Sequence, residues 1–295
     1  MGPPRKKKKG TKRRKSRKLI LLMIFFGLVF SLTLFFFLRT KPTEKKIVQP
    51  MPPPPLPAAK ETGEVRKEKE EVAVPRARLA LIIDDGGYSI DRIKGMVGIG
   101  RPMTFAILPN TPHARKVALL AHESGEQVML HLPMEPRDSD RYSLEKDTVL
   151  AGMDKKEVQT ILQRDLAQIP YVRGVNNHMG SKATEDAGVM QALMEVLKKE
   201  GLFYIDSHTS SHTLGPQMAR QAGVAFGSND RFIDQEKDSL KIKKAIRQSM
   251  EKAKKEGKAI AIGHPHPLTV QTIREMIPEI EKAGIKLVFA SEVVG

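Results

Sequence analysis

The chain has 295 residues, a formal net charge of +16 and no cysteine. This length allows one medium-sized folded domain with additional segments, and the lack of cysteine excludes disulfides and thiolate metal sites. Eleven Lys and Arg residues lie within residues 1–18, which contain no acidic residue, whereas residues 77–295 hold 30 basic and 28 acidic side chains. The domain is therefore nearly neutral, which argues against nucleic acid as a partner.

The N-terminal part divides by composition into three segments. Behind the basic tail at 1–18, residues 19–38 are uncharged and rich in Leu, Ile and Phe. A helix of this length spans about 30 Å, the thickness of the hydrocarbon core of a bilayer, so we predict an uncleaved transmembrane signal anchor. The basic tail predicts a single-pass protein of the inner (cytoplasmic) membrane, with the N-terminus in the cytoplasm and the domain in the periplasm or outside the cell.

Residues 39–76 join this segment to the domain at 77–295. They contain a proline-rich run at 50–57, followed by a stretch rich in Glu and Lys with few large apolar side chains. Such a sequence cannot bury a core, so we predict a tether that is stiff at its start and solvated afterwards. A ligand for a proline-recognising domain is the alternative interpretation of the proline run.

Apolar strand patterns alternate with helix patterns from residue 78 onward. The expected strands cover 79–83, 103–108, 127–130, 173–176, 203–205, 224–226, 259–262 and 287–289. Helices are expected at 90–97, from about 112 to 124, after a capping box of Asp154 and Glu157, from Thr184 to Gly201, from about 235 to 256, and at 269–282. This alternation predicts a parallel α/β fold, and the strand count favours a distorted (β/α) barrel of about seven to eight strands over an open sheet.

The first expected strand ends in two adjacent carboxylates, Asp84 and Asp85, followed by two glycines. Its five apolar residues are typical of a strand in a parallel sheet, where ligands bind outside the carboxyl ends of the strands. Successive strand side chains point to opposite faces, so we expect one carboxylate to face a cation and the other a reacting water. A plain Asp-Gly turn is the alternative for this motif alone.

Further polar side chains follow the other expected strands. These are His131, Asn176, Asn177, His178, Asp206, His208, His264 and His266. The carboxyl ends of all strands of a parallel barrel lie together, so these residues are expected to share one rim. Asp and His without Cys suit Zn²⁺ or a comparable divalent ion. Two further histidines, His113 and His122, fall inside an expected helix and are interpreted as structural.

These motifs resemble the polysaccharide deacetylases with a NodB-like fold, in particular their divergent branch of bacterial envelope proteins. The resemblance covers about residues 78–292 and rests on Asp84-Asp85-Gly86, on 103–106 as a second strand, on His131 after the third, and on Ile262-Gly263-His264. It implies that Asp84 is the catalytic base, that Asp85 and His131 bind the metal, and that His264 is the general acid. The implied reaction is hydrolysis of an N-acetyl group on an envelope polysaccharide or peptidoglycan-like glycan, with zinc as the expected metal.

Two of the family's motifs are altered in this chain. Four positions after His131 the sequence has Glu135 where the family has a second histidine, and the Arg-x-Pro-x-Gly motif is missing from the region of 172–180. We expect His178 to be the third metal ligand, with Glu135 as the alternative. His208 and His212 form a literal His-Thr-x-x-His motif after the wrong strand, and would be rival ligands only if His131 lay far away.

The remaining candidate residues are expected to have substrate-binding or secondary roles. They are Glu135, Asn177, Asp206, His208 and His266. The altered motifs leave open a catalytically impaired glycan-binding or envelope scaffolding protein with the same fold, and a hydrolase of another ester or amide. The retained Asp84, Asp85 and His264 favour an enzyme, because a binding protein needs no acid and base pair.

Overall fold

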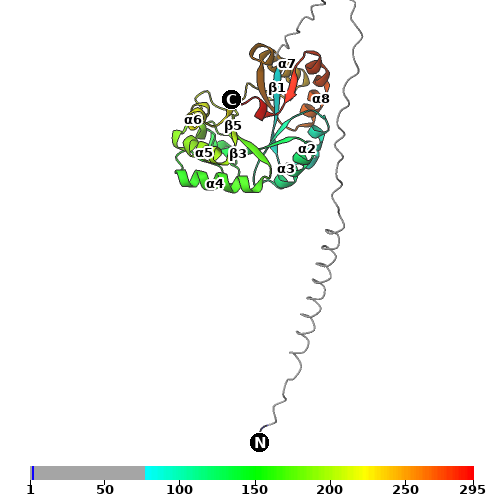
Figure 1. The fold of residues 1–295 in the computed structure, drawn as a ribbon. Coiled ribbons are helices and arrows are strands. Elements are labelled where there is room, and N and C mark those ends of the chain that lie inside the picture. The colour runs from blue at the N-terminus through cyan, green and yellow to red at the C-terminus, as the bar shows by residue number, and fades with distance from the viewer. Residues whose placement is uncertain (1, 3–76) are drawn as a thin grey trace, which may run out of the picture. The chain divides into compact units, whose positions relative to one another are not determined.

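The computed structural model describes Gly2 and residues 77–295 (Figure 1). The basic tail beyond Gly2, the expected membrane anchor at 19–38 and the expected tether at 39–76 lie outside the described residues. Within the part that is described, no helix has the length and apolar character needed to cross a membrane. This finding contradicts the predicted single-pass location in the inner membrane.

In the described part of the chain nine parallel strands form the sheet, which confirms the predicted parallel α/β class. Eight of them lie in the order β6-β5-β4-β3-β2-β1-β8-β7, and β9 pairs with β1. The strands are β1 Arg78–Gly86, β2 Thr104–Ile107, β3 Gln127–Met134, β4 Val172–Met179, β5 Phe203–Asp206, β6 Phe226–Ser228, β7 Arg231–Phe232, β8 Lys258–Gly263 and β9 Lys286–Val288. Because β1, β3 and β4 run further than the expected strands, Asp84, His131 and His178 lie within strands and not after them.

The curled sheet remains open between β6 and β7, so the expected distorted barrel of about seven to eight strands is a half-barrel in the structure. Only Asn229 and Asp230 separate the two strands, and no ladder joins them among the described residues. The link is held instead by the flanking strands, because Asn229 N donates to Asp206 O (2.8 Å) and Asp230 N donates to Ile260 O (2.9 Å). Both strands run in the same direction, and parallel neighbours need a crossover of about a dozen residues or more to pair, so two strands joined by two residues form no ladder with each other and the chain itself crosses the gap.

Helices surround the outside of the curled sheet (Figure 1). They are α2 Ile90–Val97, α3 Ala114–Glu123, α4 Lys155–Gln168, α5 Ala187–Glu200, α6 Gly215–Ala222, α7 Ser239–Glu256 and α8 Pro267–Lys282, with short 3₁₀ turns at Ser139–Arg141, Ala183–Glu185 and Ala290–Glu292. The capping box of Asp154 and Glu157 at the start of α4 is confirmed. The sequence analysis missed α6, an eight-residue helix.

The end of α5 agrees with the prediction and its start does not. Gly201 closes the helix in the left-handed conformation (φ 66°), as expected for a C-cap glycine. The N-cap is Asp186, not Thr184, because the Asp186 carboxylate accepts from the backbone N–H groups of Gly188 and Val189 (2.9 and 3.1 Å). The Thr184 hydroxyl donates to Gly180 O instead (2.8 Å).

Apolar side chains fill both faces of the sheet. In β1, Leu79, Leu81 and Ile83 pack in the cluster shared with the helices, whereas Ala80 and Ile82 belong to a second cluster inside the curl. This alternation follows from the period of two of a strand. Because apolar side chains occupy the interior, polar groups gather at the carboxyl ends of the strands.

Candidate metal centre and acid–base pair

Both carboxylates of the first motif reach the same imidazole. Asp84 Oδ2 lies 3.5 Å and Asp85 Oδ1 lies 3.4 Å from His131 Nε2. The expectation that the two side chains diverge is wrong at this point, because Asp85 has a left-handed backbone (φ 56°) and the pairing of β1 with β2 is irregular between Ile83 and Gly86. The kink that re-aims Asp85 costs on the order of 1–3 kcal/mol, which the surrounding structure must offset.

The glycines after the carboxylates give this turn the space it needs. Gly87 has φ 118°, and a Cβ at this position would overlap the Thr111 hydroxyl. Its carbonyl accepts from His113 N (2.9 Å), which ties the turn to the segment before α3. The Asp-Asp-Gly-Gly sequence therefore provides both the ligand-bearing kink and the close backbone approach that supports it.

Asp85, His131 and His178 bring three ligand atoms together from β1, β3 and β4. Asp85 Oδ1 lies 3.4 Å from His131 Nε2 and 3.3 Å from His178 Nδ1, and the two imidazole nitrogens are 3.1 Å apart. In a tetrahedral zinc site with ligands about 2.0–2.1 Å from the ion, neighbouring ligand atoms are separated by about 3.3 Å. The observed triangle therefore fits one face of such a site.

Electrostatics at this triangle also favour a cation. Asp85 Oδ1 is buried and receives no hydrogen bond from a described residue. Burial raises the pKa of Asp85, but the neighbouring imidazoles of His131 and His178 outweigh this and hold the pKa well below its ordinary value. Asp85 is thus a charged carboxylate with an unsatisfied oxygen, and together with two imidazoles it forms a donor set suited to zinc.

Asn176 connects the proposed base to a proposed ligand. Its Oδ1 accepts from His131 Nδ1 (2.8 Å), and its Nδ2 donates to Asp84 Oδ1 (2.9 Å). With Nδ1 as the donor, His131 presents the lone pair of Nε2 to the triangle, the usual way in which a second group orients a metal-binding imidazole. Asn176 was expected on the rim from the sequence but was assigned no role there, although it lies two residues before His178 and therefore on the same face of β4.

Asn177, which was selected, faces the opposite side of β4. Its Oδ1 accepts from Ser207 N (2.9 Å), and its Nδ2 donates to Met179 O (2.6 Å). The Tyr204 hydroxyl also donates to it (3.2 Å). These bonds join β4 to the end of β5, so the geometry gives Asn177 a supporting position away from the triangle.

Asp84 is buried beside the imidazoles of His131 and His264. Burial raises the pKa of its carboxyl above the ordinary value, whereas the imidazoles of His131 and His264 act in the opposite direction without cancelling the effect. The only hydrogen bond to this carboxylate among the described residues comes from the neutral amide of Asn176. A carboxylate with a raised pKa binds a proton more readily, which suits a proton acceptor.

His264 is held by a carboxylate that sequence analysis missed. His264 Nδ1 lies 2.9 Å from Asp234 Oδ1, and Asp234 Oδ2 accepts from His264 N (2.7 Å) and from the Thr269 hydroxyl (2.8 Å). Burial lowers the pKa of His264, but the hydrogen bond and charge of Asp234 raise it to about 9. His264 is thus an imidazolium at neutral pH, and its Nε2 lies 3.9 Å from Asp85 Oδ2.

Asp234 follows β7, and this explains why the sequence pattern did not reveal it. β7 has two residues, and its Phe232 ring stacks on His264 (interplanar angle 12°). A strand this short leaves no apolar run whose end would mark a polar residue. His266, also predicted at this rim, occupies the N-cap position of α8 without a capping hydrogen bond from its side chain, and it stacks on His264 with a centroid distance of 5.9 Å.

Glu135 does not join the metal-compatible group. Its Oε1 accepts from Lys182 Nζ (2.8 Å), and its Oε2 accepts from Ala151 N (2.9 Å). Burial raises the pKa of Glu135, but these donors outweigh it and lower the pKa. The carboxylate is therefore occupied in holding the loops after β3 and β4, and the geometry favours His178 over Glu135 as the third ligand.

The residues at the end of β5 organise a loop. Asp206 is buried and accepts from His208 N (2.7 Å) and from the Thr213 hydroxyl (2.7 Å). His208 has a left-handed backbone (φ 57°), and His212 is largely exposed. Asp85, His131 and His178 are the only group of three metal-compatible side chains found in the described part of the chain, so His208 and His212 form no rival site there.

Comparison with known proteins identifies the family. The family model described as divergent polysaccharide deacetylase matches residues 81–294. The protein YibQ of Escherichia coli K12 is 35% identical over 217 residues, covering 74% of this chain and 67% of YibQ. An uncharacterised protein of Haemophilus influenzae Rd is 29% identical over 223 residues, covering 74% of this chain and 79% of that protein.

A solved structure shows the same fold. The crystal structure of an uncharacterised protein from Agrobacterium tumefaciens C58 superposes with a TM-score of 0.71 at 22% identity, covering 75% of this chain and 91% of that one. At this identity the likeness concerns the fold alone. The match of the family model over residues 81–294, together with the 35% identity to YibQ, shows that this chain belongs to the divergent polysaccharide deacetylase family.

Proposed function

We propose that this protein is a metal-dependent deacetylase that hydrolyses the N-acetyl group of a carbohydrate, with an envelope glycan such as a peptidoglycan-like polymer as its substrate class. The observation that carries the proposal is the triangle of Asp85 Oδ1, His131 Nε2 and His178 Nδ1, whose separations of 3.1 to 3.4 Å match those of a tetrahedral site. Family membership supports the same reaction class.

Asp85, His131 and His178 would hold the divalent ion, and zinc suits this donor set best. A bound ion of this kind polarises an amide carbonyl and lowers the pKa of water from 15.7 to about 7. Asn176 orients His131 by accepting from its Nδ1 (2.8 Å). The ligand set is therefore supported by a buried neighbour, as in metal sites whose geometry is fixed before substrate binds.

Two further side chains would move the protons of the reaction. Asp84, buried and 3.5 Å from His131 Nε2, would accept the proton of the attacking water. His264, charged at neutral pH through Asp234, would donate its Nε2 proton to the nitrogen of the departing sugar amine. The C–N bond then breaks with release of acetate and a free amine, and solvent restores both groups to their starting protonation states.

A glycan-binding protein without turnover is the second candidate. The observation that favours it concerns Asp84. Burial raises the pKa of this carboxyl, and its hydrogen-bond donor Asn176 is a neutral amide that supplies no positive charge. A raised pKa favours the neutral acid, and the neutral acid does not accept a proton from water. The charge of a bound ion would act in the opposite direction and favour the ionised form.

The test measures acetate release and bound metal on the same samples of zinc-loaded full-length protein. Wild type should release acetate from an N-acetylglucosamine oligomer, and Asp84→Asn and His264→Ala should each lower the rate by about 10²–10⁴-fold while retaining the metal. His122→Ala, a histidine stacked on Tyr171, is the matched control and should behave as wild type. A fully metal-loaded wild type that binds the oligomer and releases no acetate would establish the binding protein instead.

A further inference from the structure

A cavity of about 410 Å³ is formed by β7, the segment after it and the first half of α7. Its polar and aromatic lining includes Arg231, Phe232, Gln235, Lys241, Lys244 and Gln248. The three α7 residues follow one another at intervals of three and four positions, so they lie on one face of the helix. The volume lies within the range of about 300–1,000 Å³ that is typical of ligand sites.

Most of the positive charge of α7 is neutralised by ion pairs. The helix carries seven Lys and Arg side chains. Five of them, Lys241, Lys243, Arg247, Lys252 and Lys254, pair with Glu236, Glu275, Glu279, Asp230 and Glu251 respectively. The other two, Lys244 and Lys255, have no carboxylate partner among the described residues, and of these two Lys244 alone lines the cavity.

The cavity therefore holds an excess of positive charge. Arg231 is the second lining cation whose side chain has no carboxylate partner in the part of the chain that the structure describes. Glu236, which also lines the cavity, is paired with Lys241. The carboxylate of Asp238 acts on Lys241 from nearby, but it accepts from two backbone N–H groups at the start of α7 (2.8 and 3.0 Å). Arg231 and Lys244 are thus left to face a ligand.

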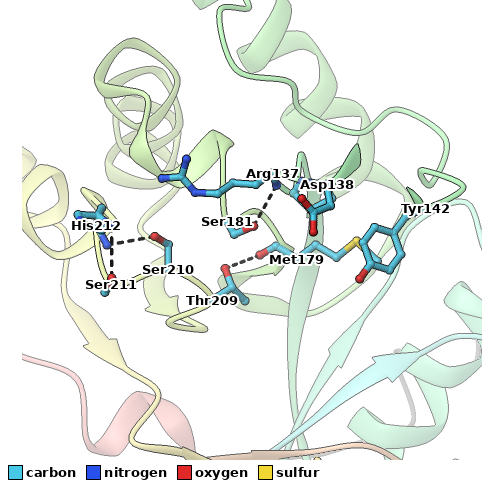
Figure 2. Close-up of a pocket in the computed structure, with 10 residues that line it drawn as sticks. Arg137, Asp138, Tyr142, Met179, Ser181, Thr209, Ser210, Ser211 and His212 are labelled. Atoms are coloured by element: carbon cyan, nitrogen blue, oxygen red, sulfur yellow. Dashed lines mark hydrogen bonds between the residues drawn. The ribbon is translucent and has the colours of Figure 1, made fainter. Parts of the chain in front are cut away.

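A larger cavity of about 700 Å³, among the loops after β3, β4 and β5, differs in this respect (Figure 2). Its lining arginine and its lining aspartate both have partners, because Arg137 pairs with Glu185 and Asp138 Oδ2 lies 3.7 Å from Arg141 Nη1. A charged ligand would have to compete with these partners. The two unpaired cations therefore distinguish the cavity at α7 from this one.

The hydrogen-bond donors of the cavity at α7 suit an anion with several oxygens. A guanidinium presents five N–H donors in a fixed fork and an ammonium presents three, and the side-chain amides of Gln235 and Gln248 add neutral donors. A phosphate group offers three or more acceptor oxygens and carries about −1.5 to −2 charge at neutral pH, which matches two unpaired cations. A carboxylate has two oxygens and a single charge, so it would satisfy fewer of these donors.

We propose that the cavity at α7 binds a phosphate group, as the free ion or as a phosphate ester, with Arg231 and Lys244 as its charged contacts. The proposal follows from two unpaired cations in one cavity, from the amide donors beside them and from the pairing of the other charges around them. It does not depend on the proposed function, because neither residue belongs to the metal centre or to the acid–base pair. Phe232 lines the cavity and stacks on His264, so the phosphate site adjoins the proposed active site without sharing a charged residue with it.

The test measures binding of inorganic phosphate to metal-free full-length protein by isothermal titration calorimetry at low ionic strength. Without metal, phosphate has no ion to bind at the triangle, and low salt limits the screening of an exposed site. Arg231→Gln and Lys244→Gln should each weaken phosphate binding by about 10-fold, the scale of one lost hydrogen bond to a charged group. Lys255→Gln is the matched control and should bind phosphate as wild type does, because Lys255 lies on the same helix, also lacks a carboxylate partner among the described residues and does not line the cavity.

All these variants share the basic tail at 1–18, so its attraction for anions cancels in the comparison. Wild-type phosphate affinity in Arg231→Gln and Lys244→Gln, or an equal loss of affinity in Lys255→Gln, would overturn the proposal. Acetate that binds wild type as tightly as phosphate does would also overturn it, because the site is proposed to select a doubly charged anion. Glycerol phosphate separates the two sources of the ligand. Tighter binding of glycerol phosphate than of inorganic phosphate, weakened in Lys244→Gln, supports a phosphate ester, and the reverse order supports the free ion.

Discussion

Asn176 provides the sharpest test of the metal centre, because one buried amide contacts both a proposed ligand and the proposed base. Asn176→Ala removes the acceptor for His131 Nδ1 (2.8 Å) and the donor to Asp84 Oδ1 (2.9 Å). Neither atom has another hydrogen-bond partner among the described residues. His131 is then free to rotate or to change its tautomer, which would turn the Nε2 lone pair away from the triangle.

The expected magnitudes follow from burial. A buried polar group left without a partner costs about 1–3 kcal/mol, so the free energy of unfolding of the metal-free variant should fall by about that amount for each of the two groups. Loss of a group that orients a metal-binding imidazole typically weakens metal binding by about 10–100-fold. The two effects are separable, because stability can be measured without metal.

The assay combines urea denaturation of the metal-free protein with zinc affinity measured by competition against a chelator. Asn177→Ala is the matched control: Asn177 is equally buried and also makes several hydrogen bonds, but it faces away from the triangle. It should lose stability and retain zinc affinity. Wild-type zinc affinity in Asn176→Ala, or an equal loss of affinity in both variants, would refute the role assigned to Asn176.

Three further predictions concern single groups. In metal analysis after dialysis, His178→Ala should contain at least about 10-fold less zinc than wild type, whereas Glu135→Ala should retain its zinc. Full zinc occupancy in His178→Ala would exclude His178 as a ligand. Asp234→Asn should lower the pKa of His264 from about 9, seen by NMR titration. A histidine whose pKa is raised in the folded state stabilises the fold fully at a pH below its ordinary pKa of 6.5, and this stabilisation is lost as the pH rises through about 9. Wild type should therefore lose its stability advantage over Asp234→Asn as the pH rises from 6.5 through about 9. Burial raises the pKa of Asp165 in α4 to about 7, so the folded state favours the neutral acid. The contribution of Asp165 to the free energy of unfolding therefore falls as the pH rises from about 4 through 7. Asp165→Asn should gain stability relative to wild type between pH 5 and pH 8 in urea denaturation, and a difference that stays constant with pH would contradict this.

Apart from α6 and β7, sequence alone determined the succession of strands and helices and the rim on which the polar residues gather. Each of the other strands had an apolar run long enough to mark it, and polar residues near its end marked the carboxyl edge of a parallel sheet. That reasoning placed Asp85, His131 and His178 on one rim. The resemblance to the polysaccharide deacetylases implied Asp85 and His131 as metal ligands, with His178 as the expected third, and the fold brings their candidate ligand atoms within 3.1 to 3.4 Å of one another. Parallel topology fixes this convergence, because it depends on strand direction and not on side-chain detail.

Only the tertiary structure decided how those residues are oriented and which neighbours support them. The kink at Asp85 overrides the alternation of the strand, and the pairing of β3 with β4 places Asn176, not Asn177, beside His131. Asp234 meets His264 across 30 residues, after a strand too short to leave a pattern. The gap between β6 and β7 likewise depends on long-range pairing, because β6 pairs with β5 and β7 pairs with β8. Local periodicity contains none of this, because backbone kinks, register and long-range contacts are set by packing between segments that are distant in the chain.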